Sequence, residues 1–98
     1  MPSYRFTKAA TDDLLTIYLA GLEQFGVVQA DRYHDDLERM FAFLAETPRA
    51  ARLREELNPP VRAHPFKAHI IVYDETDDGI LILRVRHGRE DWISTPES

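Results

Sequence analysis

The sequence contains no cysteine, which excludes disulfides, thiolate catalysis and cysteine-based zinc sites. It has no apolar run near the roughly 18 residues of a membrane-spanning helix. Its beginning, Met1 to Arg5, lacks the hydrophobic stretch of a signal peptide. The four glycines are dispersed, so no phosphate-binding glycine loop is present. We therefore expect a cytoplasmic protein without a membrane segment.

Lysine is also scarce, because Lys8 and Lys67 are the only two in 98 residues. Twelve Lys and Arg against 17 Asp and Glu give a net charge of −5, which argues against direct binding of nucleic acid. The charge is uneven, since residues 1–48 carry 4 basic and 8 acidic side chains and residues 49–98 carry 8 and 9. A surface that faces anions is therefore expected in the second half.

Residues for nucleophilic or metal chemistry are poorly placed. Ser3, Ser94 and Ser98 lie near the ends of the chain. His64 and His69 are five residues apart in a strand-rich segment, which is not a usual metal spacing. We interpret both histidines as polar strand residues. The sequence thus predicts no catalytic residue, no metal site and no cofactor.

Two helical patterns fill the first half of the chain. Thr7 can cap the first helix, Gly26 can end it, and Pro48 prevents the second helix from continuing. Asp12 and Asp13 are interpreted as partners of the first helix dipole. The apolar positions recur at helical spacing: Ala10, Leu14, Ile17, Tyr18, Leu22 and Phe25, then Ala30, Tyr33, Leu37, Met40, Phe41 and Leu44. Their very short link predicts an antiparallel helical hairpin.

The remaining segments indicate strands. We expect strands at residues 4–6, 61–66, 67–74 and 80–87, with a turn at Asp78-Gly79 joining the last two. Residues 49–60 form a connector in which residues 50–57 are expected to make a helical turn. The fold class is therefore α+β: an N-terminal strand, an antiparallel helical hairpin and a three-strand antiparallel sheet. Residues 1–98 are expected to form a single domain.

The strongest chemical cluster follows the last strand and consists of Arg84, Arg86, His87, Arg89 and Trp92. Alternation places Arg84 and Arg86 on one face of the strand. Arginine binds phosphate or carboxylate through two parallel hydrogen bonds, and histidine exchanges protons near neutral pH. The cluster therefore fits either a ribonuclease site or a binding surface.

A structural role is the alternative for these cations. They would then form ion pairs that hold the connector and the tail to the sheet, with Glu55, Glu56, Glu90 and Asp91 as partners. Ion pairs on the rim of a sheet are commoner than functional sites, so residue types alone favour this alternative.

In the order and spacing of its motifs, the chain resembles the ParE toxins of the RelE/ParE superfamily, which belong to bacterial toxin–antitoxin pairs. The resemblance covers nearly the whole chain. It is carried by Tyr4-Arg5-Phe6, Ala9-Ala10, Asp13-Leu14, Ile17-Tyr18, Gly26, Gln29-Ala30, Tyr33, Leu37, Phe41, the helix end Leu44 to Pro48, and Arg84 to Trp92. The last stretch is the strongest part.

The resemblance implies a helical hairpin against a small antiparallel sheet, and a growth-inhibiting toxin neutralised by a ParD-like antitoxin. ParE-type members are generally linked to poisoning of DNA gyrase, whereas RelE-type members are ribosome-dependent endoribonucleases. The ribonuclease branch is typically basic and uses lysines or a terminal tyrosine. The net charge of −5, the two lysines and Trp92 at the tail position therefore favour the ParE branch.

Three hypotheses follow from these observations. The first is a non-enzymatic gyrase inhibitor of a kind associated with plasmid stabilisation, with Arg84, Arg86, His87, Arg89 and Trp92 as its target-binding surface. The second is a RelE-type ribonuclease that uses His87 as acid or base and the arginines on phosphate. The third is a degenerate member that only binds its antitoxin. The segment 49–57 and the acidic pair Glu90-Asp91 depart from the family pattern.

Overall fold

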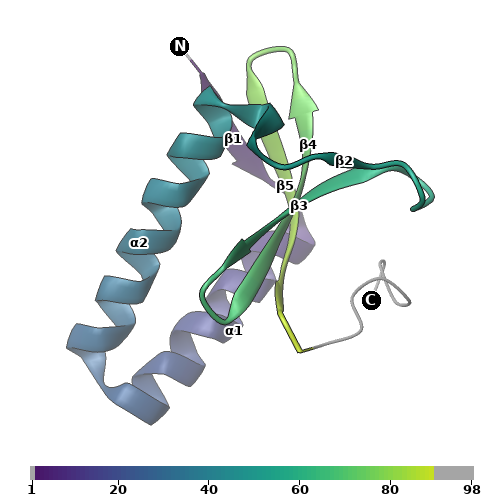
Figure 1. Ribbon diagram of the computed structural model, residues 1–98. Coiled ribbons are helices and arrows are strands. Elements are labelled where there is room, and N and C mark those ends of the chain that lie inside the picture. Colours follow the sequence, from purple (N-terminus) through teal and green to yellow (C-terminus); the bar gives the residue numbers. More distant parts are fainter. Residues whose placement is uncertain (1, 90–98) are drawn as a thin grey trace.

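The computed structural model describes residues 2–89 as two layers, a helical hairpin packed on one face of a five-stranded sheet (Figure 1). In chain order the elements are β1 (Ser3–Phe6), α1 (Lys8–Phe25), α2 (Val27–Glu46), the short 3-10 helix η1 (Pro48–Ala50), β2 (Leu53–Arg54), β3 (Val61–Phe66), β4 (His69–Thr76) and β5 (Gly79–His87). The predicted α+β class and the antiparallel helical hairpin are confirmed.

The strands lie in the order β1-β5-β4-β3-β2. The three predicted strands β3, β4 and β5 are antiparallel neighbours, while β1 pairs with β5 in parallel. Val72 of β4 lies opposite Arg84, but the next residue, Tyr73, lies opposite Ile82. Leu83 is therefore the extra residue of a β-bulge, and it shifts the register of everything that follows it in β5.

The connector differs from the prediction, because the helical turn expected over residues 50–57 is wrong. Leu53 and Arg54 instead form β2 and pair with Arg62 and Val61. The Arg62 guanidinium donates to the Ala51 carbonyl at 2.8 Å, so a side chain from β3 takes an acceptor that a helix would have used. The short helix η1 ends before this point.

Thr7 determines where the first helix begins. Its Oγ1 accepts the Ala10 N–H at 3.0 Å and caps α1, while its hydroxyl donates to the Leu83 carbonyl at 2.7 Å. Gly26, with φ of 88°, ends α1 and begins α2. The helices have 18 and 20 residues, yet no helix among residues 2–89 is both long and apolar enough to span a membrane.

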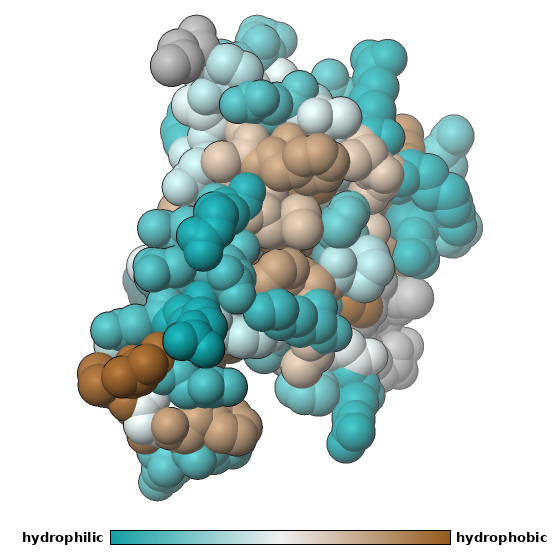
Figure 2. All heavy atoms as spheres, turned by 60° about the vertical axis from the view of Figure 1, so that its left-hand side comes forward, coloured by the Kyte–Doolittle hydropathy of each residue, from teal (hydrophilic) through white to brown (hydrophobic). Residues whose placement is uncertain are grey.

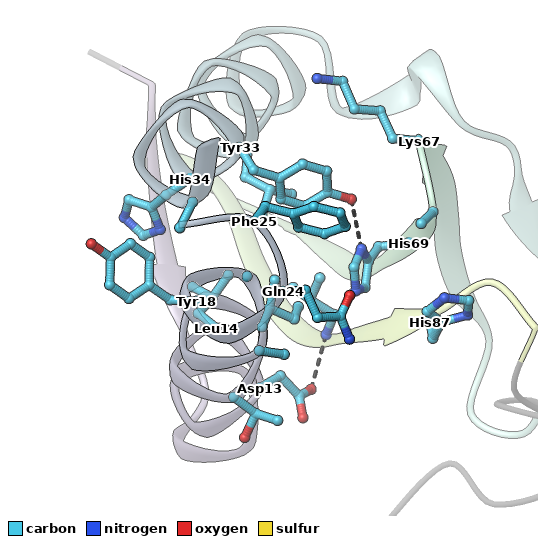
Figure 3. Close-up of a pocket in the computed structure, with 18 of the residues that line it drawn as sticks. Asp13, Leu14, Tyr18, Gln24, Phe25, Tyr33, His34, Lys67, His69 and His87 are labelled. Carbon is cyan, nitrogen blue, oxygen red and sulfur yellow. Dashed lines mark hydrogen bonds between the residues drawn. The ribbon is translucent and has the colours of Figure 1, made fainter. Parts of the chain in front are cut away.

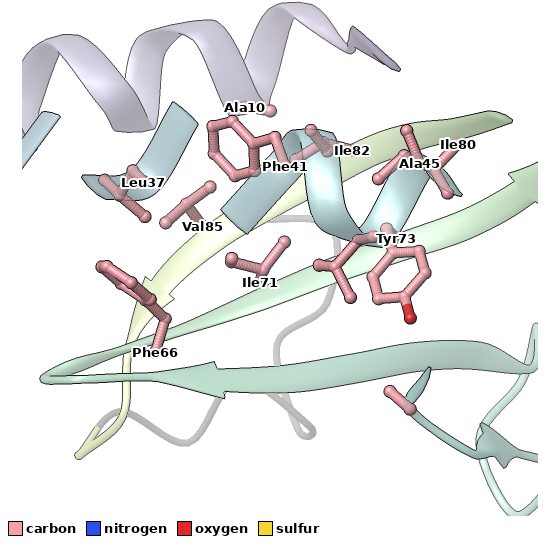
Figure 4. Packing of buried hydrophobic residues seen from close by; sticks show 12 residues of the cluster. Ala10, Leu37, Phe41, Ala45, Phe66, Ile71, Tyr73, Ile80, Ile82 and Val85 are labelled. Carbon is pink, nitrogen blue, oxygen red and sulfur yellow. The ribbon is translucent and has the colours of Figure 1, made fainter. Parts of the chain in front are cut away.

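The core lies between the hairpin and the sheet (Figure 4). Its buried members are Ala10, Leu37, Phe41, Leu44, Ala45, Ala51, Phe66, Ile71, Tyr73, Ile80, Ile82 and Val85. The buried face predicted for α2 is confirmed, whereas α1 buries fully only Ala10. Phe25 was expected in the buried face but is 66% exposed, because the hairpin extends beyond the sheet at this end (Figure 1).

Candidate functional site

A groove of about 870 Å³ opens where the hairpin diverges from the end of the sheet (Figure 3). Both helices form one wall, and the β3–β4 turn with the end of β5 forms the other. The helical wall is mixed. Leu14, Ile17 and Ala20 of α1 and Ala30 and Leu37 of α2 are apolar, whereas Gln24, Gln29 and His34 add polar groups. The groove therefore combines apolar and polar side chains on its helical side, opposite a strand side that carries Lys67, His69, Arg86 and His87.

The apolar surface continues to the free end of the hairpin. Phe25 lines the groove, and Val27 and Val28 follow it at the tip with exposed fractions of 57% and 69%. Figure 2 shows a strongly hydrophobic group at this end of the molecule. Exposed apolar patches beside a groove commonly mark protein–protein contact sites.

Tyr33 of α2 faces the strand side of the groove and contacts it directly. Its hydroxyl lies 2.6 Å from Nδ1 of His69, and the His69 ring meets the His87 ring edge-on at a centroid distance of 5.4 Å (Figure 3). Burial raises the pKa of the Tyr33 hydroxyl, although a backbone hydrogen bond from Ala68 acts in the opposite direction. Tyr33 is therefore a neutral hydrogen-bonding group at physiological pH.

Lys67 stands at the rim, in the turn between β3 and β4. Its backbone has a φ of 51°, and its ammonium lies 5.4 Å from the Tyr33 ring centroid and 5.3 Å from that of Phe66. It also lies 2.8 Å from Oδ2 of Asp36. The hydrogen bond from Lys67 is the main reason why the pKa of Asp36 lies below its usual value. The turn thus fixes one ammonium group beside two aromatic rings.

The Asp13 carboxylate of α1 interacts with both arginines of β5, Arg84 and Arg86. Its carboxylate accepts from Arg84 Nε at 2.8 Å and lies 3.5 Å from a terminal nitrogen of Arg86. It also accepts the backbone N–H of Val85 at 3.0 Å. The pairing of β1 with β5 ends at Phe6 and Ile82. Beyond that point the Asp13 carboxylate, and not a β1 carbonyl, accepts the Val85 N–H. Asp13 therefore acts on β5 and not, as predicted, on the dipole of its own helix.

The structure divides the predicted cationic cluster. Arg84 and Arg86 meet at Asp13, whereas His87 faces His69 and lines the groove. Arg89 has an exposed side chain, and its backbone N–H donates to His87 Nδ1 at 3.1 Å. Trp92 lies outside the described residues.

The expected ion-pair partners differ as well. Glu56 pairs with Arg52 and Arg54 of its own segment, and Arg84 pairs with Asp13. Glu90 and Asp91 lie outside the described residues. An ion pair is thus present at Arg84, but a helix supplies its carboxylate.

Sequence reasoning missed four residues of this site: Asp13, Tyr33, Lys67 and His69. For Tyr33 the helix core was preferred to a surface groove for a partner, and His69 was interpreted as a polar strand residue. The β4–β5 hairpin offered a signal for His69, because cross-strand neighbours can be counted from the turn. Counting from the pair of Thr76 and Gly79 gives the correct partners only as far as the bulge at Leu83. Beyond the bulge the pairing is shifted by one residue, so His69 lies opposite His87 and not Arg86.

The chain is similar to known proteins over nearly its whole length. The profile of the family described as "ParE toxin of type II toxin-antitoxin system, parDE" matches residues 4–92. Toxin ParE1 of Mycobacterium tuberculosis is 30% identical over 89 residues, which cover 90% of this chain and 91% of that protein. Toxin ParE3 of Caulobacter vibrioides is 29% identical over 83 residues, or 85% and 83% of the two chains.

A solved structure has the same fold. A chain of the chromosomal ParDE system from P. aeruginosa superposes with a TM-score of 0.74 at 23% sequence identity. The match covers 89% of this chain and 96% of that one. The strand, helical hairpin and sheet described above are therefore similar to those of a protein from a toxin–antitoxin system.

Proposed function

The chain belongs to the ParE toxin family of type II toxin–antitoxin systems, and from this premise we propose that it inhibits DNA gyrase by protein–protein contact. The observation that carries the proposal is the family match over residues 4–92. The net charge of −5 also suits a protein target better than a polyanion. The action we propose is stoichiometric and involves no catalysis.

We propose that the contact surface is the predicted set Arg84, Arg86, His87, Arg89 and Trp92. Within it, the exposed Arg89 and the partly exposed His87 offer the most accessible described groups. Arg84 and Asp13 have side-chain exposures of only 13% and 12%, so Arg84 serves to position the strand. The Arg86 side chain is 24% exposed, so it approaches Asp13 and also stays partly accessible to a target.

A supercoiling assay with purified gyrase tests this proposal. Added toxin should block supercoiling, and Arg89→Glu should weaken the block because it reverses the charge of an exposed contact residue. Arg39→Glu makes the same charge change on α2 and is the matched control. Normal supercoiling at an excess of the folded toxin would contradict gyrase as the target.

We propose that a ParD-like antitoxin neutralises the toxin by covering the groove. The apolar side chains of the helical wall, together with Phe25, Val27 and Val28, offer the hydrophobic surface that a docking segment needs. Co-expression with the product of the adjacent gene should give a stable complex and restore growth. Unimpaired growth when the toxin is expressed alone would instead support a degenerate member that only binds antitoxin.

The observations do not favour the ribonuclease alternative. None of the matches reported above supports it, since they are all ParE proteins or a ParDE system. Arg84 and Arg86, which that mechanism would place on phosphate, face the carboxylate of Asp13. Primer extension on messenger RNA after induction should accordingly give no new cleavage ends.

A further inference from the structure

The face of the sheet that the hairpin leaves open has a charge pattern of its own. Within residues 2–89 both helices lie on the other face, where they pack against Tyr4 and Ile80 (Figure 1). Side chains alternate between the two faces along a strand, so Arg5, Leu81 and Asp74 point to the open face. This face is therefore available to a partner.

The register sets these three side chains in one row across the sheet. Arg5 of β1 lies opposite Leu81 of β5, and Leu81 lies opposite Asp74 of β4. Neighbouring strands are about 4.8 Å apart, so roughly 10 Å separates Arg5 from Asp74, with the leucine between them. The order of the row is basic, apolar, acidic.

Neither charge of this row has a partner in the described part of the chain. The Asp74 carboxylate makes no hydrogen bond or ion pair with any side chain of residues 2–89, and burial raises its pKa. Arg5 is exposed, and its guanidinium pairs with none of these residues either. A partly buried carboxylate without a cation is unfavourable, so an occupant that supplies a cation would be stabilised there.

A second copy of the chain supplies both missing charges. Two sheets packed face to face lie about 10 Å apart, a distance that one arginine and one aspartate side chain can span together. A two-fold axis that runs along β5 above Leu81 places Arg5 of each copy over Asp74 of the other and brings the two leucines together. The surface is therefore complementary to itself, as the interface of a two-fold dimer must be.

We propose that the open face of the sheet is a homodimer interface, centred on Leu81 and held by two reciprocal ion pairs between Arg5 and Asp74. This inference goes beyond the proposed inhibition of gyrase and does not depend on it. The groove lies between the hairpin and the end of the sheet, so such a dimer leaves both grooves open. Each copy can then still bind an antitoxin.

The charges of other occupants fit this face less well. Residues 90–98 include Glu90, Asp91 and Glu97 but no lysine or arginine, so they offer no cation to Asp74. A nucleic acid would bring its phosphates to the same carboxylate, and the net charge of −5 opposes it further. A second copy matches both charges of the row at once.

Sedimentation velocity of the purified full-length toxin tests the interface. The wild type should be largely dimeric at roughly 100 μM, as expected for a dissociation constant in the micromolar range. Arg5→Asp and Asp74→Arg should each weaken dimerisation at least tenfold, because each sets like charges against each other. Arg39→Asp makes the same charge change as Arg5→Asp on the exposed side of α2 and is the matched control. Circular dichroism shows whether each variant is folded.

An equimolar mixture of the two variants tests the pairing itself. When Arg5→Asp faces Asp74→Arg, both reciprocal pairs again unite opposite charges, so the mixture should dimerise nearly as well as the wild type. If Asp74→Arg does not fold, Asp74→Asn replaces it and should also weaken dimerisation, because it removes the charge without adding bulk.

Three results would overturn the interface: a wild-type toxin that stays monomeric, single variants as dimeric as Arg39→Asp, or a mixture of folded variants that stays monomeric. A monomeric wild type whose antitoxin binding is lost in Asp74→Arg would assign the open face to the antitoxin instead. The supercoiling assay is independent of these measurements, so failure of the dimer and failure of gyrase inhibition are distinguishable.

Discussion

The carboxylate of Asp13 in α1 receives two nitrogens of the Arg84 guanidinium from β5, with Nε 2.8 Å from Oδ2 and a terminal nitrogen 2.9 Å from Oδ1. Such paired hydrogen bonds are the strongest geometry for a guanidinium and a carboxylate. The same carboxylate accepts the Val85 N–H. One side chain of the hairpin therefore holds the end of β5 that carries the proposed contact surface.

Asp13→Asn should lower the free energy of unfolding by about 2–4 kcal/mol, because it removes the charge that accepts two hydrogen bonds from the largely buried Arg84 guanidinium. Urea denaturation measures this loss as a lower midpoint. Asp12→Asn is the matched control, since within residues 2–89 Asp12 pairs only with the exposed Lys8, and its change should cost less than about 0.5 kcal/mol. Equal midpoints for the two variants would show that the Asp13 ion pair does not stabilise the fold.

Gly79→Ala should destabilise the β1–β5 pair. A Cβ at Gly79 would lie 1.7 Å from the Ser3 carbonyl oxygen, and the residue has a φ of +153°. The two strands would have to separate, at a cost of roughly 2 kcal/mol or more. Gly21→Ala places its Cβ in ordinary contact, 3.4 Å from Ala30 Cβ, and should raise stability by up to about 1 kcal/mol through better helix propensity. The prediction fails if both variants unfold at the same temperature.

Stability should depend on pH through Asp74, whose pKa burial raises above 3.8. A raised pKa in the folded state means that the protonated form favours folding, and this contribution is lost as the pH rises through the folded pKa. Asp74→Asn should therefore raise the urea midpoint at neutral pH but give no gain below pH 3.8. Asp77→Asn, an exposed residue of the adjacent turn, makes the same change in charge. A gain from Asp74→Asn that is equal at both pH values would rule out this linkage.

We expect the Tyr33 hydroxyl to donate to His69 Nδ1, so the neutral imidazole of His69 should carry its proton on Nε2. Nitrogen-15 NMR of the ring distinguishes the two tautomers directly. Tyr33→Phe removes the hydroxyl that lies 2.6 Å from His69 Nδ1, so the His69 tautomer should become mixed while His87 keeps its own. A dominant Nδ1–H form of His69 in the wild type would mean that Tyr33 accepts this hydrogen bond.

Much of the fold could be predicted because local signals determine it. Thr7, Gly26 and Pro48 stand where α1 begins, where the two helices meet and just after α2 ends. Val61–Phe66 forms the strand that its pattern predicts. The errors came from long-range contacts: the hydrogen bond from Arg62 to the Ala51 carbonyl accompanies a strand where a helical turn was expected.

The site could be predicted only in part. The inclusion of Arg86 and His87 follows from composition and spacing, which point to the second half of the chain, whereas α1 and α2 line most of the groove. The groove itself needs Tyr33 from a helix and Lys67 from a turn, and no sequence pattern joins residues so far apart. Phe25 shows the same limit, because helical periodicity cannot tell that the hairpin extends past the sheet.

The sequence by itself determined the order of elements, the acidic charge and the family pattern, since caps, turn residues and apolar periodicity act over a few residues. Only the tertiary structure decided which side chains meet. Counting back from the Asp78-Gly79 turn places His69 opposite Arg86, but the bulge at Leu83 moves His87 into that position. One extra residue exchanges the two faces of a strand, so it directs His87 into the groove and Arg84 to Asp13, while Arg86 both lines the groove and approaches Asp13.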